Sequence, residues 1–167
     1  MKKILCVIDM QNDFVTGVLG SQEAQDLVDP IEQFIINFDG DVVYTQDTHF
    51  EDYLETQEGK RLPVEHCICE SEGWQIIPEF APLAERKFKK GTFGSVMLGE
   101  WLYQQNPDEI HFVGVCTGLC VLSNAVLAKS FCPEARIVVH KDLCACVSPE
   151  SHQTALKAME TMQMDVE

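Results

Sequence analysis

Four polar or reactive side chains follow apolar runs that have the character of buried strands. Asp9 comes directly after residues 4–8, Asp47 closes the run 41–46, and Cys116 and Cys120 follow a third run that ends at residue 115. In open α/β sheets, ligands bind beyond the carboxyl ends of the strands. Each of these side chains alone is explained as a helix cap or a buried thiol, but their common position predicts a site at one edge of a sheet.

The sharpest candidate for a nucleophile is Cys120. It lies in Gly-Val-Cys-Thr-Gly-Leu-Cys-Val at 114–121, where the chain is expected to leave a strand and begin a helix. The positive end of a helix dipole stabilises a thiolate and lowers the pKa of the thiol. The free N–H groups of the same turn can hold an oxyanion. We therefore expect a nucleophile and its oxyanion hole in one loop, with Asp9 available to carry a proton.

A second set of candidate ligands begins at the same edge. Asp47 and His49 stand two positions apart, and Glu58 and His66 follow in a segment without regular periodicity. Carboxylate and imidazole ligands suit Zn²⁺, Mn²⁺ or Fe²⁺, although this spacing alone is weak evidence, because acidic loops that contain a histidine are common. Cys-x-Cys pairs at 67/69 and 144/146 are a poorer basis for a zinc site, which prefers about two to four intervening residues.

These candidates require a frame of alternating strands and helices. The continuous apolar runs are typical of strands buried on both faces of a parallel sheet. Ser21 and Ser148 are expected to cap helices, and Pro30 marks either a kink or a second helix start. The segment 48–87 has little periodicity, which favours a functional connection. We expect strands at 3–9, 41–46, 109–115, 135–140 and 164–166, and helices from 21 and at 95–104, 118–130 and 148–162. This order predicts an α/β fold with both faces of the sheet covered, in one domain over 1–167.

The charge balance restricts the partners. Twelve basic and 27 acidic side chains give a formal charge of −15. Such a field repels a phosphate backbone and an anionic membrane surface, so we expect no nucleic acid and no membrane as partner. The apolar residues 4–8 are too few for a signal peptide or a membrane span. We expect a cytoplasmic protein whose eight cysteines are reduced thiols.

Four motifs together resemble the isochorismatase-like cysteine hydrolases, and among these the nicotinamidases most. They are Asp-Met-Gln-Asn-Asp-Phe at 9–14, Asp-Thr-His at 47–49, Lys-Gly-Thr-Phe at 90–93, and the run at 114–121. They occur in the order and at the separations of that family, over about residues 4–158. The resemblance implies a three-layer α/β/α fold around a mostly parallel, Rossmann-like sheet.

The resemblance also assigns roles. Asp9 would be the general acid and base, Cys120 the nucleophile and Lys90 the catalytic lysine, which the residues alone do not distinguish from neighbouring lysines. The N–H groups of Cys116 and Cys120, after a cis peptide, would form the oxyanion hole. Many members carry Asp where this chain has Gly118. The other assignments are a pocket lined by Phe14, Leu19 and Leu119, and a divalent metal, Zn, Mn or Fe, held by Asp47, His49, Glu58 and His66.

Three functions are compatible with these residues. The first is hydrolysis of a small-molecule amide, nicotinamide to nicotinate and ammonia, through a thioester on Cys120 and with the help of a metal. The second keeps the fold but takes another small amide, a carbamoyl or a ureido compound. The third is a non-enzymatic thiol redox sensor or binding protein that uses Cys116 and Cys120. Self-association into a homo-oligomer stays open in each case.

Overall fold

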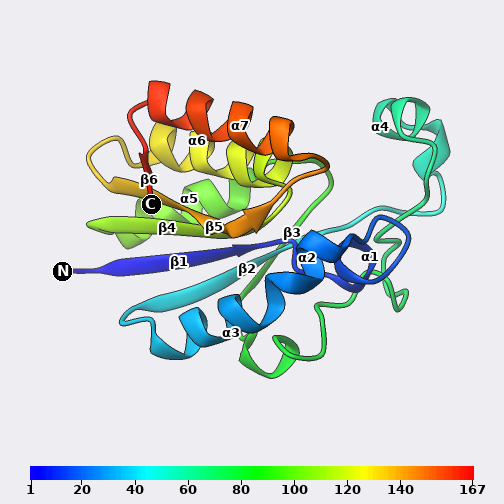
Figure 1. The fold of residues 1–167 in the computed structure, drawn as a ribbon, viewed down its shortest axis with the longest axis horizontal. Coiled ribbons are helices and arrows are strands. Elements are labelled where there is room, and N and C mark those ends of the chain that lie inside the picture. Colours follow the sequence, from blue (N-terminus) through cyan, green and yellow to red (C-terminus); the bar gives the residue numbers. More distant parts are fainter.

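The computed structural model describes residues 1–167 and is built on one sheet of six parallel strands (Figure 1). Their spatial order is β3-β2-β1-β4-β5-β6, so the order of addition reverses between β1 and β4. Because all strands are parallel, their carboxyl ends lie at one edge of the sheet. The bounds are β1 Lys3–Ile8, β2 Asp41–Asp47, β3 Lys87–Lys90, β4 Glu109–Val115, β5 Arg136–Ala145 and β6 Asp165–Val166.

Helices cover both faces of the sheet. On one face lie α2 (Gln22–Asp26) and α3 (Val28–Asn37), and on the other lie α5 (Val96–Gln105), α6 (Leu122–Phe131) and α7 (Pro149–Thr161) (Figure 1). One apolar cluster fills each interface between helices and sheet. This is the three-layer α/β/α arrangement that the sequence predicts. None of the helices has the length and apolar character needed to cross a membrane.

The central strand β1 explains the unbroken apolar run near the N-terminus. Ile4, Cys6 and Ile8 belong to the cluster under α5, α6 and α7, whereas Leu5 and Val7 belong to the opposite cluster. All five side chains are fully buried. Burying an aliphatic side chain contributes about 1.5–3 kcal/mol. The run therefore anchors the strand whose end positions Asp9.

The helix starts are set by short polar side chains. The hydroxyl oxygens of Ser21, Ser95 and Ser148 each accept the N–H of the residue three positions later, at 3.1 Å. Such caps satisfy N–H groups that have no partner within the helix. Pro30 lies in the first turn of α3, after the chain has already broken at Leu27. It therefore marks a second helix start and not a kink.

The irregular segment predicted over 48–87 lies beside the sheet and contains only short helices. A 3₁₀ turn at Tyr53–Glu55 and the helix α4 (Gln57–Arg61) come first, and a second 3₁₀ turn at Ala81–Leu83 precedes β3. The short helix α1 (Asn12–Val15) lies beside this segment (Figure 1), and the N–H groups of Asn12 and Asp13 donate to the carbonyls of Gln75 and Gly73.

Three details of the sequence prediction were wrong. Strand β5 continues to Ala145, because it pairs with β4 again after a shift of register. Strand β3 was not predicted, because its buried Lys90 makes the run Lys-Phe-Lys-Lys resemble a solvated turn. The helix predicted over 118–130 begins with a π-helical turn at Thr117–Val121, and α6 starts only at Leu122.

The cysteines also differ from the expectation of reduced thiols. Cys116 and Cys146 form a disulfide between the turn after β4 and the loop after β5. The other six cysteines are free. The pairing was not visible in the sequence, because only the folded sheet brings together two residues 30 positions apart.

Candidate functional site

Asp9, Lys90 and Cys120 meet at the carboxyl edge of the sheet, where the strand order reverses. Asp9 follows β1, Lys90 ends β3, and Cys120 lies in the turn after β4. The Lys90 Nζ atom is 2.6 Å from Asp9 Oδ2 and 3.5 Å from Cys120 Sγ. All three residues are buried. The structure thus brings together the three residues that the family resemblance singles out.

The ammonium group of Lys90 also contacts residues outside this trio. It donates to Asp47 Oδ1 at 3.1 Å and to the Thr92 carbonyl at 3.0 Å. The alternation of β3 points Lys90 inward together with Phe88. A buried charge needs paired partners, and two carboxylates supply them here. Lys90 therefore joins the cysteine side of the site to Asp47.

The carboxylate of Asp9 is fixed by Thr45 on the neighbouring strand. The Thr45 hydroxyl donates to Asp9 Oδ1 at 2.6 Å and accepts the Asp9 N–H at 3.1 Å. Asp9 has a φ of 48°, in the left-handed region that Asp tolerates better than most residues. One oxygen is thus held by Thr45, and the other faces Lys90.

The electrostatics of the trio favour a thiol beside a carboxylate. Burial raises the pKa of Asp9, against the opposing effect of Lys90. Burial also raises the pKa of Cys120 well above its ordinary value, and the negative charge of Asp9 adds to this rise. The prediction of a lowered thiol pKa was wrong, because burial and the charge of Asp9 outweigh the opposing charge of Lys90. A carboxylate with a raised pKa is the better acceptor for the thiol proton.

In the turn that carries Cys120, two backbone N–H groups share one carbonyl acceptor. The N–H groups of Leu119 and Val121 both donate to the Cys116 oxygen, at 3.1 and 3.2 Å. The amide of Cys116 itself has no acceptor within the chain, and the peptide bond that precedes it is cis. An N–H group beside the thiol is what an oxyanion requires. The Cys116 amide is therefore available for that purpose.

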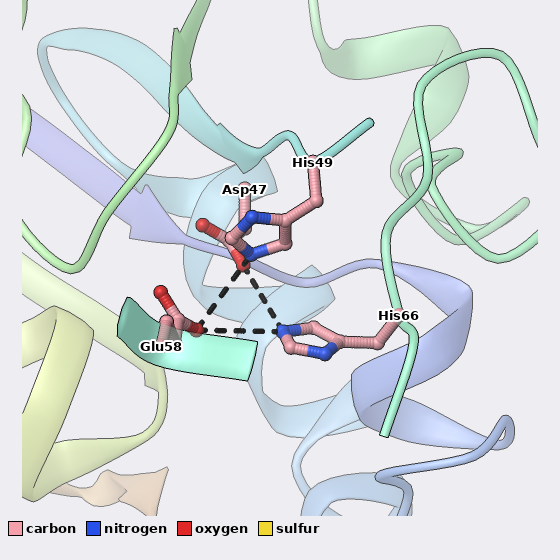
Figure 2. Close-up of side chains that lie close together, drawn as sticks. All are labelled: Asp47, His49, Glu58 and His66. Carbon is pink, nitrogen blue, oxygen red and sulfur yellow. Dashed lines mark hydrogen bonds and ion pairs between the residues drawn. The ribbon is translucent and has the colours of Figure 1, made fainter. Parts of the chain in front are cut away.

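Asp47, His49, Glu58 and His66 form a second cluster and point toward one another (Figure 2). Their potential ligand atoms all lie within 4.8 Å of one another. His49 Nε2 is 2.9 Å from Asp47 Oδ2 and 3.7 Å from Glu58 Oε1. His66 Nε2 is 3.5 Å and 3.8 Å from the same two oxygens. The four residues come from the end of β2, the segment after it and α4.

The chemistry of this cluster fits a divalent cation. His66 Nδ1 donates to the Val64 carbonyl at 2.8 Å, so its Nε2 atom can present a lone pair to the cluster. Burial favours the neutral form of Asp47, but hydrogen bonds from His49 and His66 outweigh it and lower the pKa of the carboxyl. Two carboxylates and two imidazoles are a donor set suited to Zn²⁺, Mn²⁺ or Fe²⁺.

Gln11 holds the backbone of Asp47 in place. Its side-chain oxygen accepts the Asp47 N–H at 2.7 Å, and its amide nitrogen donates to the Asp47 carbonyl at 2.8 Å. The same nitrogen donates to the carbonyl of Trp74 at 2.9 Å. Gln11 is fully buried. The motif that begins at Asp9 therefore also positions the second cluster.

A cavity of about 440 Å³ opens onto both clusters. It is lined by Cys120 of the first cluster and by Asp47, Glu58 and His66 of the second. The walls are mostly apolar and include the three predicted pocket residues Phe14, Leu19 and Leu119. Further lining residues that were not predicted are Val18, Leu62, Phe93, Cys146 and Val147. Such a cavity suits a small, flat, largely apolar molecule with few polar groups.

Several residues that support the site were not predicted from the sequence. Thr45 and Gln11 orient the two acidic residues, and Asn124 joins the cysteine turn to the segment after Lys90. A signal was present for each, since these polar residues stand within or beside apolar runs. The Cys-x-Cys pairs, by contrast, form no metal cluster, and Cys146 is in the disulfide.

Comparisons with known proteins show which family the chain resembles. The sequence profile of the Isochorismatase domain matches residues 3–167. The chain is 34% identical to the uncharacterized isochorismatase family protein PncA of Bacillus subtilis, over 93% of each chain. It is 27% identical to the nicotinamidase/pyrazinamidase of Mycobacterium tuberculosis, over 98% of this chain and 97% of that one.

The fold is shared as well. A crystal structure of nicotinamidase PncA from Bacillus subtilis superposes with a TM-score of 0.81 at 30% identity, over 99% of both chains. The profile match spans nearly all of the sequence, and the motifs that carry the resemblance converge at one edge of the sheet. The chain is therefore a member of the isochorismatase family of hydrolases.

Proposed function

We propose that the protein is a cysteine amidohydrolase that converts nicotinamide to nicotinate and ammonia. The observation that carries this proposal is the contact of Lys90 with both clusters beside one apolar cavity. A nucleophile and a nitrogen-binding centre then face the same small volume. A planar ring with a carboxamide at one end and a ring nitrogen at the other has the chemistry to engage both.

In the first half-reaction, Cys120 attacks the carboxamide. Asp9 takes the thiol proton while Sγ bonds to the carbonyl carbon, and the oxygen becomes an oxyanion. The N–H groups of Cys116 and Cys120 stabilise that charge. Asp9 then returns the proton to the nitrogen, ammonia leaves, and a thioester remains on Cys120.

In the second half-reaction, water replaces ammonia. Asp9 takes a proton from the water as its oxygen adds to the thioester carbon, and the same N–H groups stabilise the second oxyanion. The carbon–sulfur bond then breaks, the thiolate takes the proton from Asp9, and the product is released as the acid, which gives its proton to solvent and becomes nicotinate. Lys90 stays an ammonium throughout, because the carboxylates of Asp9 and Asp47 raise its pKa against the effect of burial.

Asp47, His49, Glu58 and His66 would hold the divalent metal, Zn, Mn or Fe. When bound, such an ion supplies a coordination site for the lone pair of a ring nitrogen. Phe14, Leu19 and Leu119 would flank the ring. Fixing the ring at its far end reduces the entropic part of the barrier, because the carbonyl is then held near the thiol.

The relatives support amide chemistry. The Mycobacterium tuberculosis relative is named a nicotinamidase/pyrazinamidase, and the Bacillus subtilis structure is described as a nicotinamidase. These proteins are 27% and 30% identical to this chain. Their names favour an aromatic carboxamide over a carbamoyl or ureido substrate.

The test is release of ammonia from nicotinamide, with benzamide as a matched compound that lacks the ring nitrogen. We expect turnover of nicotinamide and a loss on the order of 10²-fold in kcat/KM for benzamide. Cys120→Ala should abolish turnover, whereas Cys69→Ala, a control at a partly exposed free cysteine, should not. Turnover of an aliphatic or ureido amide but not of nicotinamide would overturn the proposal.

A further inference from the structure

The disulfide between Cys116 and Cys146 lies where no structural cross-link is needed. Strands β4 and β5 already pair up to Val115 and Ala145, directly before the two cysteines. The disulfide instead ties the residue whose amide faces the substrate carbonyl in the proposed reaction to the loop that precedes α7. The state of this disulfide can therefore affect the position of the Cys116 amide.

The disulfide separates two cavities. The substrate cavity lies on one side, and a second cavity of about 430 Å³ lies on the other. Cys116, Leu119, Cys146 and Val147 line both cavities. The two cavities thus adjoin at the disulfide, and a molecule in the outer cavity lies beside both cysteines.

Gly118 keeps the outer cavity open at the disulfide. A Cβ atom at this position would lie 3.4 Å from Cys146 Sγ and 3.6 Å from Ala155 Cβ. Any larger side chain would extend from there into the space beside the sulfur. The absence of a side chain at position 118 therefore leaves a path to Cys146.

The outer cavity has a distinct charge. Glu150 is the only ionisable residue among those that line it, apart from the two cysteines, and the lining contains no lysine, arginine or histidine. The whole chain carries a formal charge of −15. A cationic small molecule is therefore favoured over an anionic one of the same size.

We propose that Cys116–Cys146 is a thiol–disulfide exchange site for small aminothiols, reached through the outer cavity. The thiolate of the aminothiol attacks Cys146 Sγ, a mixed disulfide forms there, and Cys116 leaves with its electron pair and takes up a proton. A second aminothiol attacks the outer sulfur of the mixed disulfide and frees Cys146 as a thiol. Two aminothiols are thereby oxidised to one disulfide, and the protein disulfide is reduced to two thiols. The reverse reaction with the oxidised aminothiol restores the cross-link.

Exchange at this site should change turnover, a consequence that rests on the proposed function. The oxidised form holds the Cys116 amide against the loop after β5, whereas the reduced form leaves that loop free to move. Misplacing an oxyanion donor by a fraction of an ångström lowers kcat, so we expect the reduced form to be slower on the order of tenfold.

The exchange reaction can be measured without any substrate. The full-length protein is first reduced with cysteamine, a sample in which both cysteines should be alkylated, and is then freed of the small thiol and incubated with cystamine. Unreacted thiols are blocked with iodoacetamide, and peptides are mapped by mass spectrometry without reduction. We expect one linked peptide pair that contains Cys116 and Cys146. Free, alkylated Cys116 and Cys146 after this treatment would overturn the proposal.

The route is tested with a pair of neighbouring variants on α7. Thr154 lines the outer cavity, whereas Gln153 is exposed and lines neither cavity. Thr154→Phe should slow reduction by cysteamine on the order of tenfold, because access limits exchange, and Gln153→Phe should not. Equal rates for the two variants would show that the outer cavity is not the route.

The ligand class is tested by comparing cysteamine with 3-mercaptopropionate at equal thiolate concentrations. Cysteamine should react faster, and Glu150→Gln should reduce the difference. A faster reaction with the anionic thiol would overturn the preference for aminothiols. If exchange occurs as described but nicotinamide is not hydrolysed, the proposed function fails and the exchange site stands.

Discussion

At the scale of single residues, the arrangement depends on one buried ammonium group. Lys90 reaches from β3 past the end of β2 and places its Nζ atom between Asp9, Asp47 and Cys120. Two carboxylates in a buried site repel each other, and a single cation between them offsets that repulsion. Lys90 therefore stabilises the acidic residues of both clusters at once.

Replacing Lys90 should lower the stability of the fold. Lys90→Met keeps the length of the side chain but removes its charge, so Asp9 and Asp47 remain buried with no cation between them. Removing one partner of a buried ion pair costs about 3–5 kcal/mol. We expect a loss of that order in the free energy of unfolding, measured with urea.

The same variant should lose activity. Without the ammonium group, the pKa of Asp9 rises further, and Asp9 becomes a less efficient general acid and base. We therefore expect kcat/KM for nicotinamide to fall on the order of 10²-fold or more. Lys89→Met is the matched control, because Lys89 is exposed and lies over the ring of Trp74. Equal activity of the two variants would contradict this role of Lys90.

At the scale of elements, the site depends on how the first turns after the strands are tied together. The side-chain amide of Asn124, one turn after Cys120, donates to the carbonyls of Cys120 at 2.8 Å and Phe93 at 3.1 Å. Its oxygen accepts the N–H of Ser95 at 2.9 Å. One buried side chain thus fixes the cysteine turn relative to the segment that follows Lys90.

We expect Asn124→Leu to lower kcat more than it changes KM. The variant is similar in size but leaves several buried polar groups without partners, which costs about 2–4 kcal/mol. The resulting shift of the cysteine turn should reduce kcat on the order of tenfold. Ser130→Ala, on the exposed part of the same helix, is the control for steady-state kinetics. An unchanged kcat with lowered stability would contradict a positioning role.

The second cluster takes its candidate metal ligands from the end of β2 and from the irregular segment that follows it. Glu58 lies on the short helix α4, which stands beyond the carboxyl edge of the sheet (Figure 1), and its side chain is more exposed than that of His49. We expect about one divalent ion per chain, with a larger loss of metal in His49→Ala than in Glu58→Ala. Elemental analysis after gel filtration measures this, and His111→Asn is the control. Absence of bound metal after incubation with zinc would contradict the assignment.

The elements that the sequence predicted well are those whose environment is uniform along their length. Strand β1 is apolar because both of its faces are covered, and the predicted caps at Ser21 and Ser148 are local interactions. Strand β3 was missed because its register depends on Lys90, whose burial is possible only beside acids from other strands. The disulfide was missed for the same reason, since it requires the pairing of β4 with β5.

At the scale of the whole molecule, a partly buried pair of histidines lies between strands β4 and β5, away from the site at the carboxyl edge of the sheet. His111 of β4 and His140 of β5 stack with their ring centroids 5.2 Å apart, and His111 Nδ1 lies 2.9 Å from His140 Nε2. Phe34 and Phe38 of α3 pack against the pair. The charged groups around it are Glu109, Lys3, Arg136 and Glu167.

This pair should make the stability of the fold depend on pH. Burial, together with the nearby His111, lowers the pKa of His140 to about 4, and burial also lowers the pKa of His111. The hydrogen bond between the rings needs one neutral nitrogen as acceptor, so protonating both rings removes it. Above about pH 6.5, both rings are neutral in the folded and the unfolded chain, and the pair contributes its full stabilisation.

As the pH falls from about 6.5 to about 4, the unfolded chain takes up protons at these residues before the folded chain does, so the free energy of unfolding should decrease. The expected loss is on the order of 2 kcal/mol, since part of each ring is screened by solvent. Urea unfolding across this range measures it, and NMR titration of His140 should give a midpoint well below that of a free histidine. His140→Asn removes the titrating group and should flatten the dependence in this window. An equally steep dependence in this variant would place the pH sensitivity elsewhere in the chain. Glu109, the carboxylate that contacts His111, has its pKa lowered by the hydrogen bond with His111.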